Sequence, residues 1–169
     1  MVLAIAVAVG GAGCHHASNT SSPRLVLDGR PRYADDQGVV TTLDSQHIVL
    51  DGKRSHRLTD KVRVFATATM EPVPLSGRLG QYVQLGLKGD TIAWVATFTA
   101  IVQLPGTPRL AFHIGTLERV DAKRRAIFRD GTVLALDEEA AAPPSVPVKV
   151  RADIDVDLHR IRELVQLSD

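Results

Sequence analysis

The chain has 169 residues, with 20 Lys and Arg against 19 Asp and Glu, and a formal net charge of +1 at pH 7. This balance argues against a dedicated nucleic-acid surface. The single cysteine excludes an internal disulfide, so packing must stabilise the fold, and the length allows one domain or two very small ones.

Residues 1–13 form an uncharged run of small and aliphatic residues that ends at the only cysteine. At about 1.5 Å per helical residue this run covers only about two-thirds of a hydrocarbon core of roughly 30 Å, so it is short for a membrane span. The sequence Gly11-Ala12-Gly13-Cys14 resembles the lipobox of bacterial lipoproteins. The resemblance implies a signal peptide over residues 1–13 and an acylated Cys14 that anchors the protein in the lipid bilayer. It also implies the periplasmic face of the outer membrane, if the host has two membranes, because His15 and not Asp follows the cysteine.

Residues 15–23 contain no large apolar side chain. Such a stretch buries too little surface to offset the entropy lost on ordering. We therefore expect the acylated cysteine and a flexible tether to occupy residues 14–30.

From residue 38 onward, apolar and polar residues alternate between turn residues, which is typical of half-buried strands. Lys88-Gly89-Asp90 predicts a hairpin between a strand over 83–87 and one over 92–98, in which Trp94 would face the core. The longest alternation runs from residue 146 to 158, and we expect a bend near residues 151–153 because strands are rarely that long. The sequence thus predicts a mainly β protein.

The chain also repeats a pattern of turn residues. In each copy a glycine opens a strand, an Asp six residues later starts a turn, and an Asp-Gly pair closes the next strand. The matching positions are Gly38 and Gly115, Asp44 and Asp121, and Asp51-Gly52 and Asp130-Gly131. The separation falls from 77 residues at the opening glycine to 63 at the third strand, Tyr82 to Leu87 in the first copy and Val146 to Val150 in the second.

This order of features, with Leu79-Gly80 before the third strand and Gly89-Asp90 after it, is similar to small β-barrel repeats of unknown function in bacterial exported proteins and lipoproteins. The resemblance implies two small tandem OB-like or SH3-like barrel units, which we place at residues 31–104 and 105–169. It supplies no catalytic residue.

At the C-terminus, Leu158, Ile161, Leu164 and Val165 have helical spacing, whereas the repeat makes residues 161–165 a closing strand. Both remain open from the sequence, with a short helix slightly favoured.

No motif for nucleophilic catalysis, for zinc hydrolysis or for phosphate binding is present, and the sequence implies no cofactor. His47, His56, His113 and His159 occur singly, without an acidic partner nearby in sequence, and are interpreted as surface or turn residues.

Asp153, Asp155 and Asp157 alternate along one strand. The EF-hand pattern fails because Leu158 and Leu164 stand where a glycine and a glutamate are needed. The spacing predicts a solvated strand face, with a weak Ca²⁺ site as the alternative.

Two basic clusters lie near turns, Lys53, Arg54 and Arg57 in the first copy and Lys123, Arg124 and Arg125 in the second. Equivalent places in the two repeats would put both at barrel rims, where they could attract an anionic envelope polymer or another envelope protein. Solvated turns explain them without any partner.

Together these features predict a membrane-anchored envelope lipoprotein that acts as a non-catalytic binding or structural β module and not as an enzyme. The alternatives are an accessory domain of an envelope enzyme and a weak Ca²⁺-binding envelope protein. A deep pocket in which a histidine contacts a carboxylate would favour the enzyme.

Overall fold

The computed structural model describes residues 30–168, which form strands and loops without any helix. The predicted signal peptide, Cys14 and the tether up to residue 29 lie outside the described residues. The strands are β1 (Asp36–Leu43), β2 (His47–Leu50), β3 (Arg54–Arg57), β4 (Arg63–Ala66), β5 (Tyr82–Lys88), β6 (Thr91–Thr97), β7 (Leu110–Val120), β8 (Arg125–Phe128), β9 (Val133–Ala135), β10 (Val148–Asp155) and β11 (Arg160–Gln166).

The prediction of a mainly β fold of small barrel-like units is confirmed. Strands β1 to β6 form one sheet in the order β3-β2-β1-β5-β6-β4, and a parallel pairing of β3 with β6 closes it. We call this sheet the first barrel. Within residues 30–168, no helix exists that could cross a membrane.

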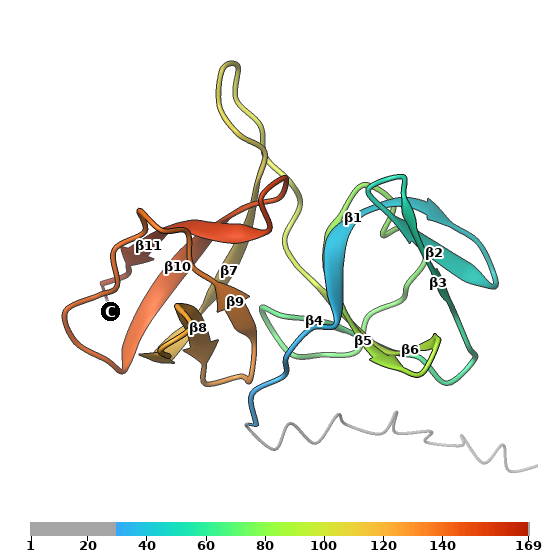
Figure 1. The fold of residues 1–169 in the computed structure, drawn as a ribbon, viewed down its shortest axis with the longest axis horizontal. Coiled ribbons are helices and arrows are strands. Elements are labelled where there is room, and N and C mark those ends of the chain that lie inside the picture. Colours follow the sequence, from blue (N-terminus) through green and yellow to red (C-terminus); the bar gives the residue numbers. More distant parts are fainter. Residues whose placement is uncertain (1–29, 169) are drawn as a thin grey trace, which may run out of the picture.

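Strands β7 to β11 form a second sheet in the order β11-β10-β7-β8-β9. Its two edges meet where Leu136 bridges Ile161 and the Asp137 amide donates a hydrogen bond to the Ile161 carbonyl at 2.8 Å. We call this sheet the second barrel. The two barrels lie side by side, and the hairpin between Val102 and Leu110 projects from the seam (Figure 1).

Both barrels follow the same plan. The first two strands of each pair through a β-bulge at the same place, between Val40 and Thr42 in one and between Leu117 and Arg119 in the other. The third strand is offset from the sequence prediction, because Gly38 faces Val83 and Gly115 faces Val150. The separation there is 67 residues and not the expected 63.

The prediction of a short C-terminal helix is wrong, and the alternative of a closing strand is correct. Residues Arg160–Gln166 form β11, which pairs antiparallel with β10 along its length. Ile161 is fully buried against the opposite strand, and its carbonyl helps close the second barrel. Closing the sheet satisfies backbone groups that a separate helix would leave exposed at a strand edge.

The prediction that Trp94 of β6 faces the core together with Ile92 is also wrong. Ile92 and Val95 enter the first core, whereas Trp94 is only half-buried. Opposite Gly86 and Leu87 of the paired strand, β6 carries a β-bulge in which Ala93 is the extra residue, so the period of two does not hold along β6.

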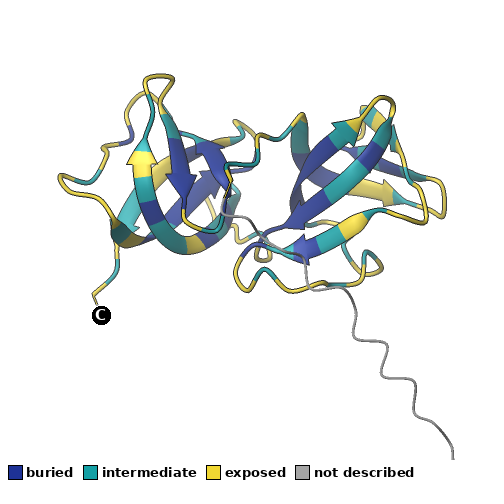
Figure 2. Cartoon of the chain, turned by 90° about the horizontal axis from the view of Figure 1, so that it is seen from below, coloured by how far each residue is buried: buried dark blue, intermediate teal, exposed yellow. Residues whose placement is uncertain are grey.

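Two buried clusters hold the molecule together. One fills the first barrel, and the other fills the second barrel while taking in Val39, Tyr82 and Phe98 from the first. Gln84, also buried, donates a hydrogen bond across the seam to the Val133 carbonyl at 2.9 Å. Buried residues therefore run through both barrels up to their junction (Figure 2). Because core packing is shared, the walls of the junction are held in place.

Candidate binding crevice between the barrels

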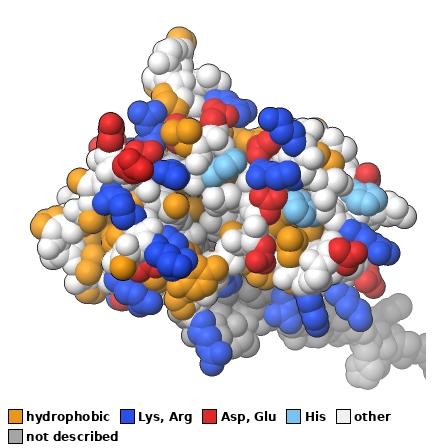
Figure 3. All heavy atoms as spheres, viewed as in Figure 1, with side chains coloured by type: hydrophobic (Ala, Val, Ile, Leu, Met, Phe, Trp, Pro, Cys, Tyr) orange, Lys and Arg blue, Asp and Glu red, His pale blue; other side chains and the backbone are white. Residues whose placement is uncertain are grey.

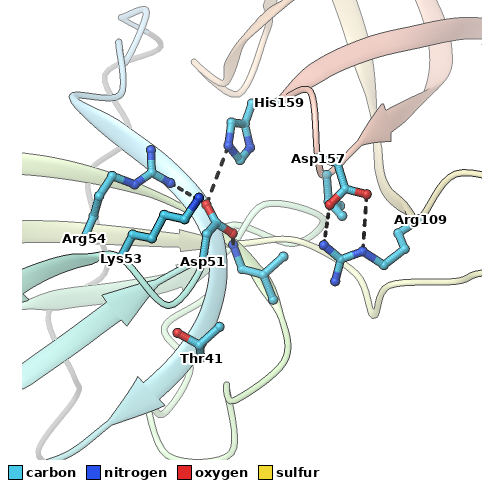
Figure 4. A pocket seen from close by; sticks show the side chains of 9 residues that line it. Thr41, Asp51, Lys53, Arg54, Arg109, Asp157 and His159 are labelled. Carbon is cyan, nitrogen blue, oxygen red and sulfur yellow. Dashed lines mark hydrogen bonds and ion pairs between the residues drawn. The ribbon is translucent and has the colours of Figure 1, made fainter.

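A pocket of about 550 Å³ lies where the two barrels meet. We call it the crevice. Its walls come from β1, from the turn before β3, from the segment before β7 and from the turn between β10 and β11 (Figure 4). The lining residues are Val39, Thr41, Asp51, Lys53, Arg54, Arg109, Val156, Asp157 and His159.

The first-barrel wall is built on the turn at Asp51 and Gly52. Both residues have left-handed backbone angles, φ 52° and φ 68°, at the centre of a β-turn in which the Lys53 amide donates to the Leu50 carbonyl at 3.0 Å. The Asp51 carboxylate accepts the Val39 amide at 2.8 Å and forms an ion pair with Arg54. The turn thus presents a carboxylate and a guanidinium to the crevice in fixed positions.

His159 faces this turn from the second barrel. It has φ 55°, a conformation that non-glycine residues rarely adopt, and its Nε2 lies 3.6 Å from Asp51 Oδ2. The imidazole stacks on the Tyr82 ring at 5.8 Å between centroids, and the Gln37 side chain donates to the His159 carbonyl at 3.2 Å. The Nδ1 atom is buried and has no hydrogen-bond partner.

The second-barrel wall carries an ion pair between Arg109 and Asp157. A side-chain hydrogen bond from Arg109 lowers the pKa of Asp157, and the same bond raises the pKa of Arg109. Lys53 is the remaining cation of the lining, and no carboxylate in the described part of the chain pairs with it. The crevice therefore combines two satisfied ion pairs with one ammonium group that is available to a ligand.

Arg54 and His159 also line a second pocket of about 340 Å³ at the seam. Arg125 reaches this pocket from the second barrel, where it pairs with Asp121 at 2.6 Å and lies over the Tyr33 ring. The junction thus holds two neighbouring pockets with Arg54 and His159 between them.

The structure brings together only part of the two predicted basic clusters. Arg54 and Arg125 share the second seam pocket, and Lys53 lines the crevice. Arg57, Lys123 and Arg124 are exposed, and Arg124 donates hydrogen bonds to the carbonyls of residues 137, 138 and 140. On the face drawn in Figure 3, Lys and Arg side chains are interspersed with Asp and Glu.

The predicted equivalence of these clusters is wrong. The amide of Leu58 donates to the Gln46 carbonyl in the first barrel, and Leu136 donates to the Arg124 carbonyl in the second. Lys123, Arg124 and Arg125 therefore correspond to the β1–β2 turn of the first barrel and not to the turn that carries Lys53.

The prediction of a solvated aspartate face is wrong as well. Asp153 and Asp155 are buried, with exposed fractions of 7% and 4%, and only Asp157 is exposed. Asp153 binds Arg151 through two hydrogen bonds, Asp155 accepts the amides of Asp157 and Leu158, and Asp157 pairs with Arg109. Each carboxylate thus has its own protein partner. No three His, Cys, Asp or Glu side chains of residues 30–168 form a group that could hold a metal ion.

The histidines differ from their interpretation as isolated surface or turn residues. His113 is buried, with Nε2 3.1 Å from Asp130 Oδ2 in an orientation short of a well-aligned hydrogen bond, and its ring lies edge-on to Phe98 and Phe128. His56 lies 2.6 Å from Asp36, and even His47 has a neighbour close in sequence, Asp44 at 3.7 Å. Each of the four has a carboxylate within ion-pair distance.

Sequence reasoning missed Tyr82, Arg109 and Val156 as parts of this junction. Nothing in their sequence context indicates this role, and only the packing of one barrel on the other brings Arg109 and Val156 to the crevice and Tyr82 against His159. Comparisons with models of protein families, with curated proteins and with solved structures find no match.

Proposed function

We propose that this protein is a membrane-anchored lipoprotein of the cell envelope whose two barrels act as a non-catalytic binding module, with the crevice as the binding site. The observation that carries the proposal is the crevice itself. Its walls are fixed by a shared core, and it presents Lys53 beside two guanidinium groups whose carboxylate partners are already satisfied.

Such a lining favours an anionic group of an envelope polymer or of a partner protein. Arg54 and Arg109 are held by their own ion pairs, so a ligand does not have to order them. Lys53 adds a charge that an anion can neutralise. The buried Nδ1 of His159 gains a hydrogen-bond partner if an acceptor or donor group enters beside it.

The binding test compares two lysines. Lys53 and Lys123 are both exposed and unpaired in the described chain and come from the two basic clusters, but only Lys53 lines the crevice. Titration with poly-L-glutamate and with polyphosphate should show that Lys53→Gln weakens binding by about threefold to fivefold, equivalent to roughly 1 kcal/mol for one exposed ion pair. Lys123→Gln should bind like the unchanged protein. Equal losses in the two variants would mean that the overall charge, and not the crevice, attracts the polymer.

The anchor is tested separately by detergent phase separation of the natural protein and of Cys14→Ser. Acylation at Cys14 predicts that the natural protein enters the detergent phase and that Cys14→Ser remains in the aqueous phase. If Cys14→Ser still partitions with detergent, the lipid anchor is wrong, whatever the outcome at the crevice.

A hydrolytic role is the second candidate, favoured by one observation: His159 approaches Asp51 within a pocket. The surroundings support binding better. Asp51 already accepts the Val39 amide and pairs with Arg54, and the Thr41 hydroxyl is engaged with the Val49 carbonyl and the Gly52 amide. Hydrolysis of p-nitrophenyl acetate or bis-p-nitrophenyl phosphate that disappears in His159→Asn, with folding intact, would establish the enzyme and refute the non-catalytic module.

A further inference from the structure

The first barrel is open at the end formed by the β1–β2 turn. A pocket of about 550 Å³ opens there, between the β1–β2 turn and the segment that joins β3 to β5. It shares no lining residue with the crevice. Its walls are aliphatic side chains with a few polar groups, formed by Leu43, Asp44, Ser45, Leu58, Thr59, Val62, Leu75, Ser76, Gly77 and Leu79. We call it the barrel-mouth pocket.

The second barrel shows the same end closed. Residues 136–147 connect β9 to β10 there, a segment half as long as residues 58–81 of the first barrel. Leu136, the counterpart of Leu58, is only 3% exposed, and Ala140 packs into the core. Arg124, although exposed, fastens this segment by donating to three of its carbonyls, and the shorter Gln46 stands at the corresponding position of the first barrel. The two barrels share the same strand arrangement, but this end is covered in the second barrel and open in the first.

The lining restricts what can enter. Its only ionisable group is Asp44, whose carboxylate accepts the amides of Gln46 and His47 at 2.7 Å. These backbone hydrogen bonds lower the pKa of Asp44, so the group stays charged and committed to the turn. The lining contains no cationic side chain that could pair with an acidic group of a ligand, and no aromatic ring on which a ligand could stack. Pockets of this size, mostly apolar with a few polar groups, are the usual form of small-molecule sites, and barrel mouths are among their usual places.

We propose that the barrel-mouth pocket binds a single acyl chain whose head group is uncharged, such as an ester. The aliphatic walls take up the chain, and Ser45, Thr59 and Ser76, which line the pocket and are exposed, offer their hydroxyls to the polar end. The inference is independent of the anionic ligand proposed for the crevice, because it uses other residues and the opposite kind of chemistry.

The test uses the full chain carrying Cys14→Ser, which removes the proposed acylation site and allows work without detergent. The probes are the fluorescent polyene fatty acid cis-parinaric acid and its methyl ester. We expect saturable enhancement of fluorescence, with tighter binding of the ester than of the free acid, because the pocket has no cation for the carboxylate and Asp44 repels it. A preference for the free acid, or a signal that never saturates, would overturn the proposal.

Two variants and a matched control locate the site. Leu79→Asp places a carboxylate at the opening and should weaken ester binding by about tenfold or more, because an apolar chain then displaces water from a charge. Ser76→Trp should also weaken it by filling the mouth. Leu104→Asp makes the same change as Leu79→Asp at equal exposure, 63% against 62%, but on the projecting hairpin, and should have no effect. Equal losses in Leu79→Asp and Leu104→Asp, or unchanged binding in Ser76→Trp, would place the probe elsewhere.

Discussion

Gly38 lies directly against the carboxylate of Asp51. A Cβ atom at position 38 would stand 2.3 Å from Asp51 Oδ2 and 2.8 Å from the nearest guanidinium nitrogen of Arg54. In the second barrel Gly115 lies in the same way against Asp130, but with more space. A Cβ on Gly115 would stand 3.5 Å from Asp130 Oδ2 and 2.9 Å from His113 Nε2. Neither glycine has a positive φ, so each is needed for space and not for backbone freedom.

Gly38→Ala should therefore destabilise the protein by about 1–3 kcal/mol, the usual cost of inserting a methyl group into a packed site. The added Cβ forces apart the Asp51 and Arg54 side chains that form one wall of the crevice. Urea unfolding measures the loss. In an Asp51→Gly background the clash with the carboxylate is absent, so the same substitution should cost less; equal costs in both backgrounds would contradict the explanation.

Tyr82→Phe should leave the protein as stable as before or more stable. The Tyr82 side chain is fully buried and its hydroxyl has no hydrogen-bond partner, while burial raises the pKa of the phenol. Removing an unsatisfied hydroxyl relieves a desolvation cost of about 1–3 kcal/mol, and the ring contacts with Phe98 and His159 remain. Thermal unfolding of both proteins decides the point, and a clear loss of stability would show that the hydroxyl has a partner in solution.

The pair of His113 and Asp130 predicts a dependence of stability on pH. Burial acts to raise the pKa of Asp130, but the contacts with His113 and the hydrogen bond from Thr132 outweigh it, so the pKa is lowered. A carboxyl with a lowered pKa in the fold contributes stability that is complete above its unfolded value of about 3.9 and is lost as the pH falls through the folded value. Unfolding midpoints between pH 6 and 2.5 should converge for the natural protein and Asp130→Asn as the pH falls. A constant difference across that range would refute the assignment.

Arg124→Gln should loosen the closed end of the second barrel. The substitution removes hydrogen bonds to the carbonyls of Asp137, Glu138 and Ala140 and introduces the residue found at the same place in the first barrel, Gln46. We expect a loss of about 1–2 kcal/mol and faster hydrogen exchange in residues 136–142. Exchange in the first barrel serves as the internal reference and should not change.

The sequence allowed much of the fold to be predicted because strands and turns leave local signals. The hairpin at Gly89 and the turns at Asp44 and Asp121 are present as expected, each Asp accepting backbone amides of the residues that follow it. Errors arose where a distant contact overrides the local pattern. Asp155 is buried because its own turn supplies two amides, and residues 160–166 are extended because β10 lies beside them.

The crevice could be predicted only in part for the same reason. Lys53 and Arg54 stood out as a basic cluster at a turn, but their meeting with Arg109, Asp157 and His159 depends on how one barrel docks on the other. That docking rests on Val39, Tyr82 and Phe98, which look like ordinary strand residues of the first barrel. Nothing in their spacing distinguishes a side chain that faces its own barrel from one that faces the neighbour.

Arg32 joins the start of the described chain to its later half. Its amide donates to the Gly131 carbonyl at 2.7 Å, and it pairs in parallel with Thr132, before the chain turns away to begin β1. The polypeptide thus touches the second barrel before it builds the first. A mechanical load applied at the N-terminal end is therefore carried first by the seam and by the barrel that is last in sequence, so β1 cannot be peeled from its sheet until that attachment has failed.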